Sequence, residues 1–506
     1  MGQLVTSLIT AAHKHPDRPA VRLEESVLSY RGLLDAAERV AGMLKARGLE
    51  PGDRICLVLP NVPAFPVLFY GSLIAGCIVL PLNPLLRHRE IEYCLQDSGA
   101  KLVFASENAG DAAVAAAQAA GAECMLVDAV GPSSEQLADA PNGTEPVQVA
   151  DDDTAVLLYT SWVSGKPRGA MLTHANLSSN AATSAIMIKC TSADVVMGCL
   201  PLFHLFGLTG GLNLAVFAGA CLTLMPRFHP TKALEIIDRD RVTIFEGVPT
   251  MYSAMVTAPN RDSVDTSTLL TCITGGSPMP VDVMKSFEQA FGCIVLEGYG
   301  LSETSPVASF NHMDAERKPG SIGTPIAGMQ LKLIGEDGND IPEGSEQIGE
   351  IAIRGDGVMK GYWQHPEDTE KIITDGWLRT GDLATRDRDG YYFIVDRKKD
   401  LIIRGGYNVY PGEIEDALRE HEAVAAAAVI GIEHPHLGEE VGAAVVLVAD
   451  AQVTVAELRN FVKLRVAAYK YPRLIWIVDD LPRGPTGQIA RRQVSPPPRA
   501  PESANQ

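Results

Sequence analysis

The feature that most constrains the fold is an alternation of helix-like and strand-like patterns near the start of the chain. Residues 31–47 place apolar side chains on one helical stripe, and 55–59 is a short apolar run that ends at a proline. The alternation continues with a helix over 63–76, a strand over 77–82, a helix over 88–98 and a strand over 101–105. Strands that alternate with helices favour parallel sheets covered on both faces. The sequence therefore predicts an α/β fold whose sheets are sandwiched between helices.

The pattern changes after about residue 396, where shorter elements follow one another as in a compact α+β domain. Thr454 and Glu457 form a capping box that predicts the start of a helix. The proline-rich end of the chain has too few apolar residues to form a core, so we expect it to be disordered. The domains that we expect are a large N-terminal domain over 1–396, a small C-terminal domain over 397–493 and a disordered tail over 494–506.

Charge and cysteine usage restrict the class of partner. The chain carries 43 basic and 62 acidic side chains, a formal charge of −19, which argues against nucleic acid or an anionic membrane as a partner. Its nine cysteines include no CxxC pair, as is typical of reduced thiols in the cytoplasm. Two long uncharged runs, 65–82 and 198–226, contain glycine and proline, so each predicts a buried helix followed by a buried strand rather than a membrane span.

The first motif with chemical content follows an apolar strand at 156–160. The chain there runs into hydroxyl groups and glycines, with Lys166 and Arg168 close by. Backbone N–H groups and hydroxyls donate hydrogen bonds to phosphate oxygens, and basic side chains neutralise their charge. The segment therefore predicts a phosphate-binding loop, with a plain Gly/Ser turn as the alternative.

Further segments add groups that suit a nucleotide. Residues 299–303 read YGLSE and combine an aromatic ring, a hydroxyl and a carboxylate that could bind Mg²⁺. Residues 379–382 read RTGD and offer a carboxylate suited to the two hydroxyls of a ribose. The segments 396–400 and 404–408 flank the change in composition, and 481–488 closes the small domain. Their joint order favours one nucleotide-dependent enzyme over a set of unrelated surface loops.

In the order and spacing of these motifs the chain resembles the adenylate-forming superfamily, specifically the acyl-CoA ligases, over residues 5–493. The resemblance implies a large α/β N-terminal domain and a small C-terminal lid that rotates between two half-reactions. In the first, a carboxylate and ATP form an acyl-adenylate; in the second, the acyl group passes to CoA. CoA and the AMP moiety of the adenylate are the implied cofactors.

The resemblance also implies which residues hold the nucleotide. Asp382 would bind the ribose, Arg397 would lie near the ribose or phosphate, and Glu303 would be the Mg²⁺ ligand, although a reaction without adenylation would not need the ion. The segments 275–278 and 297–299 would frame the adenine. The full cofactor-binding set is Thr160, Ser161, Trp162, Gly275, Gly276, Ser277, Pro278, Glu297, Gly298, Tyr299, Ser302, Glu303, Asp382 and Arg397.

The implied catalytic residues lie in both domains. His204 matches the residue between the acyl pocket and the CoA tunnel; taken alone, a core histidine would be the default interpretation, and the surrounding motif reverses it. Lys399 occupies the hinge position. The thiol would reach the acyl group along a loop that contains Gly405, Gly406 and Tyr407.

The phosphate-binding loop departs from the family pattern. The family reads Tyr-Thr-Ser-Gly-Thr-Thr-Gly, and this chain has Trp162 at the first loop glycine and Val163 at the next threonine. Glycine allows the backbone to approach a phosphate closely, whereas an indole is bulky. Arg168 stands where the family has lysine and keeps the charge in a different shape.

The closing motif departs more seriously, because Gln488 replaces the lysine that contacts the carboxylate and the α-phosphate during adenylation. Losing one preorganised stabiliser of developing charge costs roughly 3–4 kcal/mol. In these departures the chain is similar to non-adenylating ligases of the platensimycin and platencin type, which implies a bulky apolar, diterpenoid-like acid. We therefore expect transfer of a preformed acyl-AMP to CoA, with the adenylate supplied by a separate adenylating ligase. The alternatives are a complete ATP-dependent synthetase and a catalytically dead acyl-adenylate-binding protein.

Overall fold

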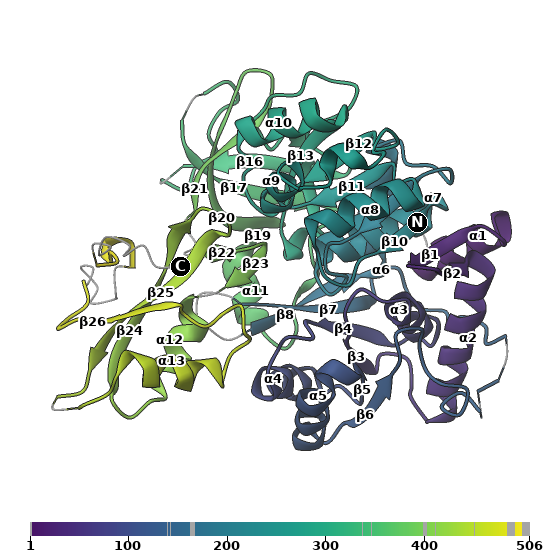
Figure 1. Cartoon of the computed structure of the whole chain (residues 1–506), viewed down its shortest axis with the longest axis horizontal. Coiled ribbons are helices and arrows are strands. Elements are labelled where there is room, and N and C mark those ends of the chain that lie inside the picture. Colours follow the sequence, from purple (N-terminus) through teal and green to yellow (C-terminus); the bar gives the residue numbers. More distant parts are fainter. Residues whose placement is uncertain are drawn as a thin grey trace. The chain divides into compact units, whose positions relative to one another are not determined.

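The computed structural model describes residues 3–138, 140–141, 143–161, 167–335, 337–345, 347–397, 402–409, 411–449, 451–482 and 491–497. All elements and contacts below belong to this described part. The chain divides into two compact units (Figure 1). The larger consists of Met1–Pro84, Ile91–Thr160 and Arg168–Asp396, and the smaller of Leu85–Glu90, Ser161–Pro167 and Arg397–Gln506.

The first sheet of the larger unit has five parallel strands at its centre, in the order β13-β12-β11-β9-β10. Their bounds are β9 (Val195–Gly198), β10 (Cys221–Leu224), β11 (Ile244–Gly247), β12 (Thr271–Thr274) and β13 (Ile294–Gly300). Shorter strands extend the two edges: β14 (Val307–Phe310) and β15 (Thr324–Pro325) beside β13, and β1 (Pro19–Leu23) and β2 (Ser26–Ser29) beside β10. The helices that pack on its apolar face are α8 (Pro230–Asp240), α9 (Pro249–Val256) and α10 (Val281–Phe291).

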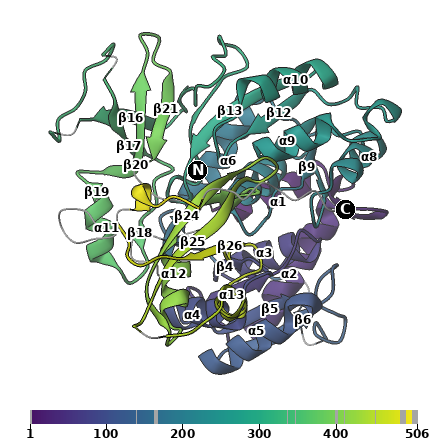
Figure 2. The same ribbon diagram turned by 60° about the vertical axis from the view of Figure 1, so that its left-hand side comes forward.

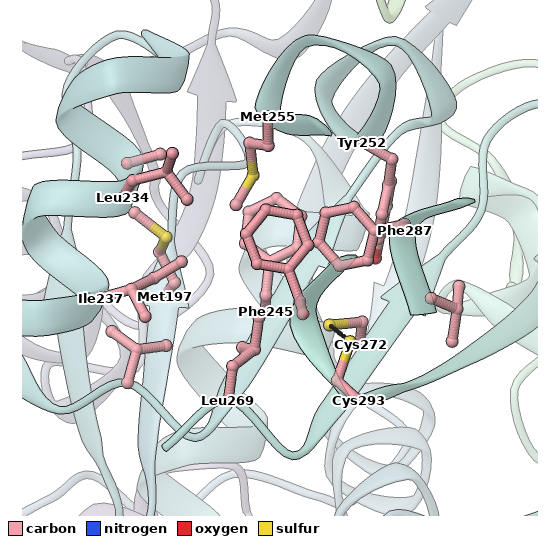
Figure 3. Packing of buried hydrophobic residues seen from close by; sticks show 14 of the residues in the cluster. Met197, Leu234, Ile237, Phe245, Tyr252, Met255, Leu269, Cys272, Phe287 and Cys293 are labelled. Atoms are coloured by element: carbon pink, nitrogen blue, oxygen red, sulfur yellow. Dashed lines mark hydrogen bonds between the residues drawn. The ribbon is translucent and has the colours of Figure 1, made fainter. Parts of the chain in front are cut away.

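Aromatic rings and sulfur atoms fill the space between these helices and the sheet (Figure 3). The Tyr252 ring meets Phe245 and Phe287 edge to face, with ring centroids 5.1 and 4.7 Å apart. Phe245 pairs in register with Cys272 on β12, and both side chains join this core. Since side chains alternate along a strand, the next residue after Phe245 is directed to the opposite face of the sheet.

The second sheet contains the strands that the alternating N-terminal pattern predicted. Its order is β18-β8-β7-β4-β3-β5-β6, and the pairs among β3 to β7 are parallel. The predicted fold class is confirmed. The strands are β3 (Arg54–Val58), β4 (Ile78–Leu82), β5 (Leu102–Ser106), β6 (Glu123–Val127), β7 (Thr154–Ser161), β8 (Pro167–Thr173) and β18 (Gly361–Tyr362).

Helices alternate with these strands as expected. Every residue of α3 is buried, so the uncharged run over 65–82 is a buried helix followed by the buried strand β4. Within the described ranges, no helix is both long and apolar enough to cross a bilayer. The remaining helices, wholly or mostly in the larger unit, are α1 (Val5–Lys14), α2 (Tyr30–Ala46), α3 (Ala64–Ile74), α4 (His88–Ser98), α5 (Glu107–Ala120), α6 (His174–Met187), α7 (Leu214–Ala218) and α11 (Pro366–Ile372).

A third, antiparallel sheet completes the larger unit. Its order is β16-β17-β20-β19, and β21 also pairs with β20. The strands are β16 (Met329–Ile334), β17 (Gly349–Gly355), β19 (Ile373–Thr374), β20 (Trp377–Arg386) and β21 (Tyr392–Arg397).

The smaller unit has one sheet, of order β23-β22-β25-β24 with β26 beside β25, and two helices that share an apolar core with it (Figure 2). The elements are β22 (Ile402–Arg404), β23 (Tyr407–Val409), α12 (Pro411–Arg419), β24 (Val424–His434), β25 (Gly438–Leu447), α13 (Val455–Lys463) and β26 (Leu474–Ile477). The capping box predicted at Thr454 and Glu457 is present. Val494 packs against a second apolar cluster, and residues 498–506 of the predicted tail lie outside the described residues.

Candidate functional site

Three parallel strands bring several of the predicted residues to one edge of the first sheet. Gly247, Thr274 and Glu297 are aligned across β11, β12 and β13, so the segments that follow the first two strands leave the sheet beside the end of the third. A methyl group on Gly275 would lie 3.2 Å from the Gly298 carbonyl oxygen, which is a close approach of two backbones. The predicted segments 275–278 and 297–299 therefore meet.

Glu297 supplies a polar group at this edge. Its carboxyl is 3% exposed, and Oε1 accepts a hydrogen bond of 2.9 Å from the Met279 N–H. Burial raises the pKa of Glu297 to about 7. Oε2 has no hydrogen-bond partner among the described residues, so it is available to a ligand that carries donors or acceptors, such as a purine base.

A second carboxylate is held by a tyrosine from β13. The Tyr299 hydroxyl donates a hydrogen bond of 2.6 Å to Asp382 Oδ2 on β20. Asp382 is buried, and its backbone N–H donates to the Thr380 hydroxyl. The pair joins two different sheets of the larger unit, and it presents a fixed carboxylate that can accept hydrogen bonds from vicinal hydroxyls.

Glu303 lies in a short 3-10 turn, η3 (Ser302–Thr304), and is almost fully buried. Its Oε1 accepts hydrogen bonds from the Tyr362 hydroxyl at 2.8 Å and from the Thr160 hydroxyl at 3.5 Å. In the described ranges no group of three or more His, Cys, Asp or Glu gathers as a metal site. A single carboxylate still fits Mg²⁺, because that ion is commonly held by one or two carboxylates together with phosphate oxygens and water.

His204 precedes a π-helix, η1 (Phe206–Asn213). The Phe206 N–H donates to His204 Nδ1 over 3.3 Å, and burial lowers the pKa of the ring to about 4. The imidazole is therefore neutral at pH 7. Because Nδ1 accepts a hydrogen bond, the tautomer that fits carries its proton on Nε2, which makes Nε2 a donor.

The smaller unit contains the loop that was predicted to guide the thiol. Gly405 and Gly406 form the turn between β22 and β23, with φ of +56° and +83°. Glycine suits both positions, since other residues rarely adopt a positive φ. The next residue, Tyr407, stacks on Tyr469 with ring centroids 4.5 Å apart. Arg404 holds the start of the turn through a bidentate ion pair with Glu440.

Some predicted residues cannot be placed. Trp162, Lys399 and Gln488 lie outside the described residues, and for Ser161 and Arg397 the description covers the backbone alone.

The structure adds a contact of the phosphate-loop region that the sequence did not predict. Arg168 Nε lies 2.9 Å from Asp368 Oδ2, and these side chains are 11% and 14% exposed. The two residues are 200 positions apart, so no local pattern could have linked them. Tyr362, which binds Glu303, is missed for the same reason.

The comparisons with known proteins agree with this arrangement. Residues 8–363 match the family of AMP-binding enzymes, and residues 413–488 match the AMP-binding enzyme C-terminal domain. The long-chain-fatty-acid–CoA ligase of Bacillus subtilis is 34% identical over 97% of this chain and 94% of its own. The feruloyl-CoA synthase of an Amycolatopsis species is 36% identical over 96% of this chain and 97% of its own.

Solved structures point the same way. The o-succinylbenzoate CoA synthetase of Bacillus subtilis, bound to a product analogue, matches with a TM-score of 0.86 and 29% identity over 97% of this chain and 98% of that one. MatB of Rhodopseudomonas palustris, solved with ATP bound, matches with a TM-score of 0.74 and 33% identity over the same shares of the two chains. The chain therefore belongs to the AMP-binding enzymes, as a member of the acyl-CoA ligase family of the adenylate-forming superfamily.

Proposed function

We propose that the protein catalyses the second half-reaction of this family, acyl-AMP + CoA → acyl-CoA + AMP, and that its own adenylation of a free acid is lost or severely impaired. The observation that carries the proposal is Gln488, an uncharged amide at the position where the family has a lysine. Glutamine donates hydrogen bonds but cannot neutralise the charge that develops between a carboxylate and the α-phosphate. The expected loss is about a hundred- to a thousand-fold in rate.

The phosphate-loop region supports the same proposal independently. Trp162 and Val163 replace a small residue and a hydroxyl where the triphosphate would fit. The guanidinium of Arg168, at the position of a further lysine, is ion-paired with Asp368. A guanidinium that is already ion-paired with a carboxylate binds phosphate less well than a basic side chain that has no carboxylate partner.

The groups expected to hold the AMP moiety and to guide the thiol are retained. Tyr299 and Asp382 form a short hydrogen bond, and Gly405 and Gly406 form a tight turn. The substitutions thus fall on the residues for activation and spare those for onward transfer. This selectivity supports a specialised transferase more than a protein without activity.

Thioester formation from an adenylate requires few catalytic groups. The CoA sulfur attacks the acyl carbon, the bond from that carbon to the phosphate oxygen breaks, and AMP leaves with the electron pair while the thiol proton passes to solvent. A thiol has a pKa of about 8.5 and is strongly nucleophilic as the thiolate. His204, neutral and protonated on Nε2, would act as a hydrogen-bond donor to the acyl oxygen rather than as a base.

The substrate that we propose is the adenylate of a bulky, mostly apolar acid, of which a diterpenoid acid is an example, made by a separate adenylating ligase. Glu303 would hold Mg²⁺ in a complete ligase. The ion polarises phosphate oxygens in such enzymes, and the transfer step proposed here does not require it.

Two assays on the same purified protein test the proposal. One supplies synthetic acyl-AMP and CoA, and the other supplies the free acid, ATP, Mg²⁺ and CoA. We expect thioester at a substantial rate in the first and at least about a hundred-fold less in the second. Equal rates would contradict the proposal. The Asp382→Asn variant serves as control, because weakened ribose binding should slow the first assay.

A second candidate, a complete ATP-dependent acyl-CoA synthetase, is favoured by the relatives, since the similar MatB was solved with ATP bound. It predicts equal rates in the two assays and pyrophosphate exchange that depends on the acid. A catalytically dead protein that binds acyl-adenylates predicts binding of acyl-AMP without thioester.

A further inference from the structure

One buried carboxyl of the first sheet lacks a full set of hydrogen-bond partners within the described ranges and has no part in the proposed transfer step. Glu246, on β11, is 2% exposed, and its Oε1 has no hydrogen-bond partner among the described residues. Burial raises its pKa to about 8. It follows Phe245, which points into the apolar core, so the Glu246 side chain lies on the opposite face of the sheet. Burying a carboxyl without hydrogen-bond partners costs folding free energy, so its presence at this position calls for an explanation.

The element that faces Glu246 is the π-helix η1. A methyl group on Gly210 would lie 3.5 Å from both carboxyl oxygens of Glu246, and one on Gly211 would lie 3.4 Å from Oε2. The two glycines thus leave room beside the carboxyl that a side chain would fill. π-Helices are rare and occur frequently at functional sites.

The same helix carries two more unsatisfied polar atoms. Within the described part of the chain, Thr209 Oγ1 and Asn213 Nδ2 have no hydrogen-bond partner, although both side chains are buried. Asn213 Oδ1 is occupied by the Tyr70 hydroxyl at 3.0 Å, which fixes the amide and leaves its Nδ2 donor available. Buried polar atoms are normally paired, so this concentration on one short helix requires an explanation.

The helix also leads to the adenylate end of the site. A methyl group on Gly275 would lie 3.4 Å from Phe206 Cε1, and one on Gly210 would lie 3.2 Å from Phe206 Cδ2. The Phe206 ring therefore lies beside both the predicted adenine segment and the glycine that faces Glu246. An acyl group that extends from the phosphate past His204 would follow this helix.

We propose that Glu246, which faces Gly210 and Gly211 of η1, recognises a hydroxyl group on the far part of the acyl chain. A hydroxyl both donates and accepts hydrogen bonds, so it can satisfy the Glu246 oxygen that has no partner among the described residues. The substrate is then a mostly apolar acid with one buried hydroxyl. This inference rests on the proposed function, because it concerns the same acyl group.

The test compares acyl-adenylates that differ only by the hydroxyl, with CoA as acceptor. Suitable pairs are 4-hydroxycinnamoyl-AMP with cinnamoyl-AMP and 12-hydroxydodecanoyl-AMP with dodecanoyl-AMP. We expect the wild-type protein to prefer the hydroxylated member of at least one pair by about 10- to 100-fold in kcat/KM. In Glu246→Leu the preference in kcat/KM should fall below about threefold, mostly because the KM of the hydroxylated substrate rises.

The design separates the outcomes. A ratio measured within one protein sample does not depend on its folded fraction, so partial misfolding of Glu246→Leu cannot imitate the result. Cys272→Ala, a buried substitution on the opposite face of the sheet, should keep the wild-type ratio. Thioester without any hydroxyl preference overturns this inference and leaves the proposed function standing. Thioester from the adenylate of a bulky polycyclic acid, but from none of these four, overturns this inference alone. Absence of thioester from every adenylate, the bulky one included, overturns the proposed function, and this inference with it.

Discussion

At the scale of single residues, two buried carboxyls of the larger unit, Glu246 and Glu297, have a raised pKa and an oxygen without a partner in the described part of the chain. Burial raises the pKa of Glu246 to about 8 and that of Glu297 to about 7. Each keeps one oxygen without a partner among the described residues. Perturbed pKa values of this kind gather at functional sites, because ligand recognition needs polar groups that the fold itself does not satisfy.

The raised pKa of Glu246 predicts how stability depends on pH. A folded-state pKa above the ordinary 4.5 means that its contribution to stability is complete below about pH 4.5 and is lost as the pH rises through about 8. Glu246→Gln stays neutral, so we expect its urea midpoint at about pH 8.5 to exceed that of the wild type, by roughly 2–4 kcal/mol in unfolding free energy. At about pH 5 the two midpoints should lie close together.

Urea unfolding followed by circular dichroism at the two pH values measures this difference. Glu235→Gln, at an exposed position on α8, should change neither midpoint. Parallel midpoints of Glu246→Gln and the wild type across the range would show that Glu246 is not held neutral by burial.

The contact between Tyr299 and Asp382 predicts a binding defect. Tyr299→Phe removes the hydroxyl that donates to Asp382 and so loosens the carboxylate proposed to bind the ribose. A hydrogen bond to a charged group contributes about 1.5–3 kcal/mol, so we expect the KM for acyl-AMP to rise roughly tenfold or more with little change in kcat. Steady-state kinetics with acyl-AMP and CoA measures both.

Tyr392→Phe is the matched control, because it removes the hydrogen bond of a buried tyrosine to the Leu331 carbonyl, on a different strand. It should lower stability without raising the KM. An unaltered KM in Tyr299→Phe would argue against a ribose site at Asp382.

At the scale of elements, the last residue of β13, Gly300, lies where only a glycine fits. A methyl group on Gly300 would lie 1.8 Å from the Pro306 carbonyl oxygen, which no structure tolerates without a backbone shift. Gly300→Ala should therefore lower the unfolding free energy by about 3 kcal/mol or more, and it should displace the flanking Tyr299 and Glu303. Gly110→Ala, in the interior of α5 and facing only the end of Leu126, should change stability by less than about 1 kcal/mol.

Thermal unfolding and the KM for acyl-AMP, measured together on the Gly300→Ala and Gly110→Ala proteins, check this prediction. A Gly300→Ala protein with wild-type stability and KM would show that the backbone there is not as tightly packed as described.

The elements that the sequence predicted are those with a strong apolar stripe or a long apolar run. The helical stripe over 31–47 corresponds to α2, and the uncharged run over 65–82 to α3 and β4. The uncharged run over 198–226 contains the predicted buried helix and strand, as η1, α7 and β10. The π geometry of η1 was not predicted, because its segment FGLTGGLN has neither a helical stripe nor capping residues. The antiparallel sheet of β16, β17 and β20 was not predicted, although β16 pairs with the next strand β17 and β17 pairs with the nearby β20.

At the scale of the whole molecule, the order of the family motifs assigned residues to the candidate site that the helix and strand periodicity does not indicate. Tyr299 and Asp382 were placed in one nucleotide site by resemblance, and they form a direct hydrogen bond. The partners Tyr362 and Asp368 could not be found in this way, since tertiary contacts alone bring them to Glu303 and Arg168. Glu246 had one signal in the sequence, an acidic residue inside an apolar strand, and it was passed over.

The central claim is that changes in the phosphate loop and in the closing motif disable activation while onward transfer survives. Pyrophosphate exchange into ATP, dependent on the acid, tests it most directly in the wild-type protein and in the double variant Trp162→Gly, Gln488→Lys. We expect exchange near background in the wild type and a rise of about a hundred-fold or more in the variant, with thioester formation from acyl-AMP retained in both. Vigorous exchange by the unaltered protein would contradict it.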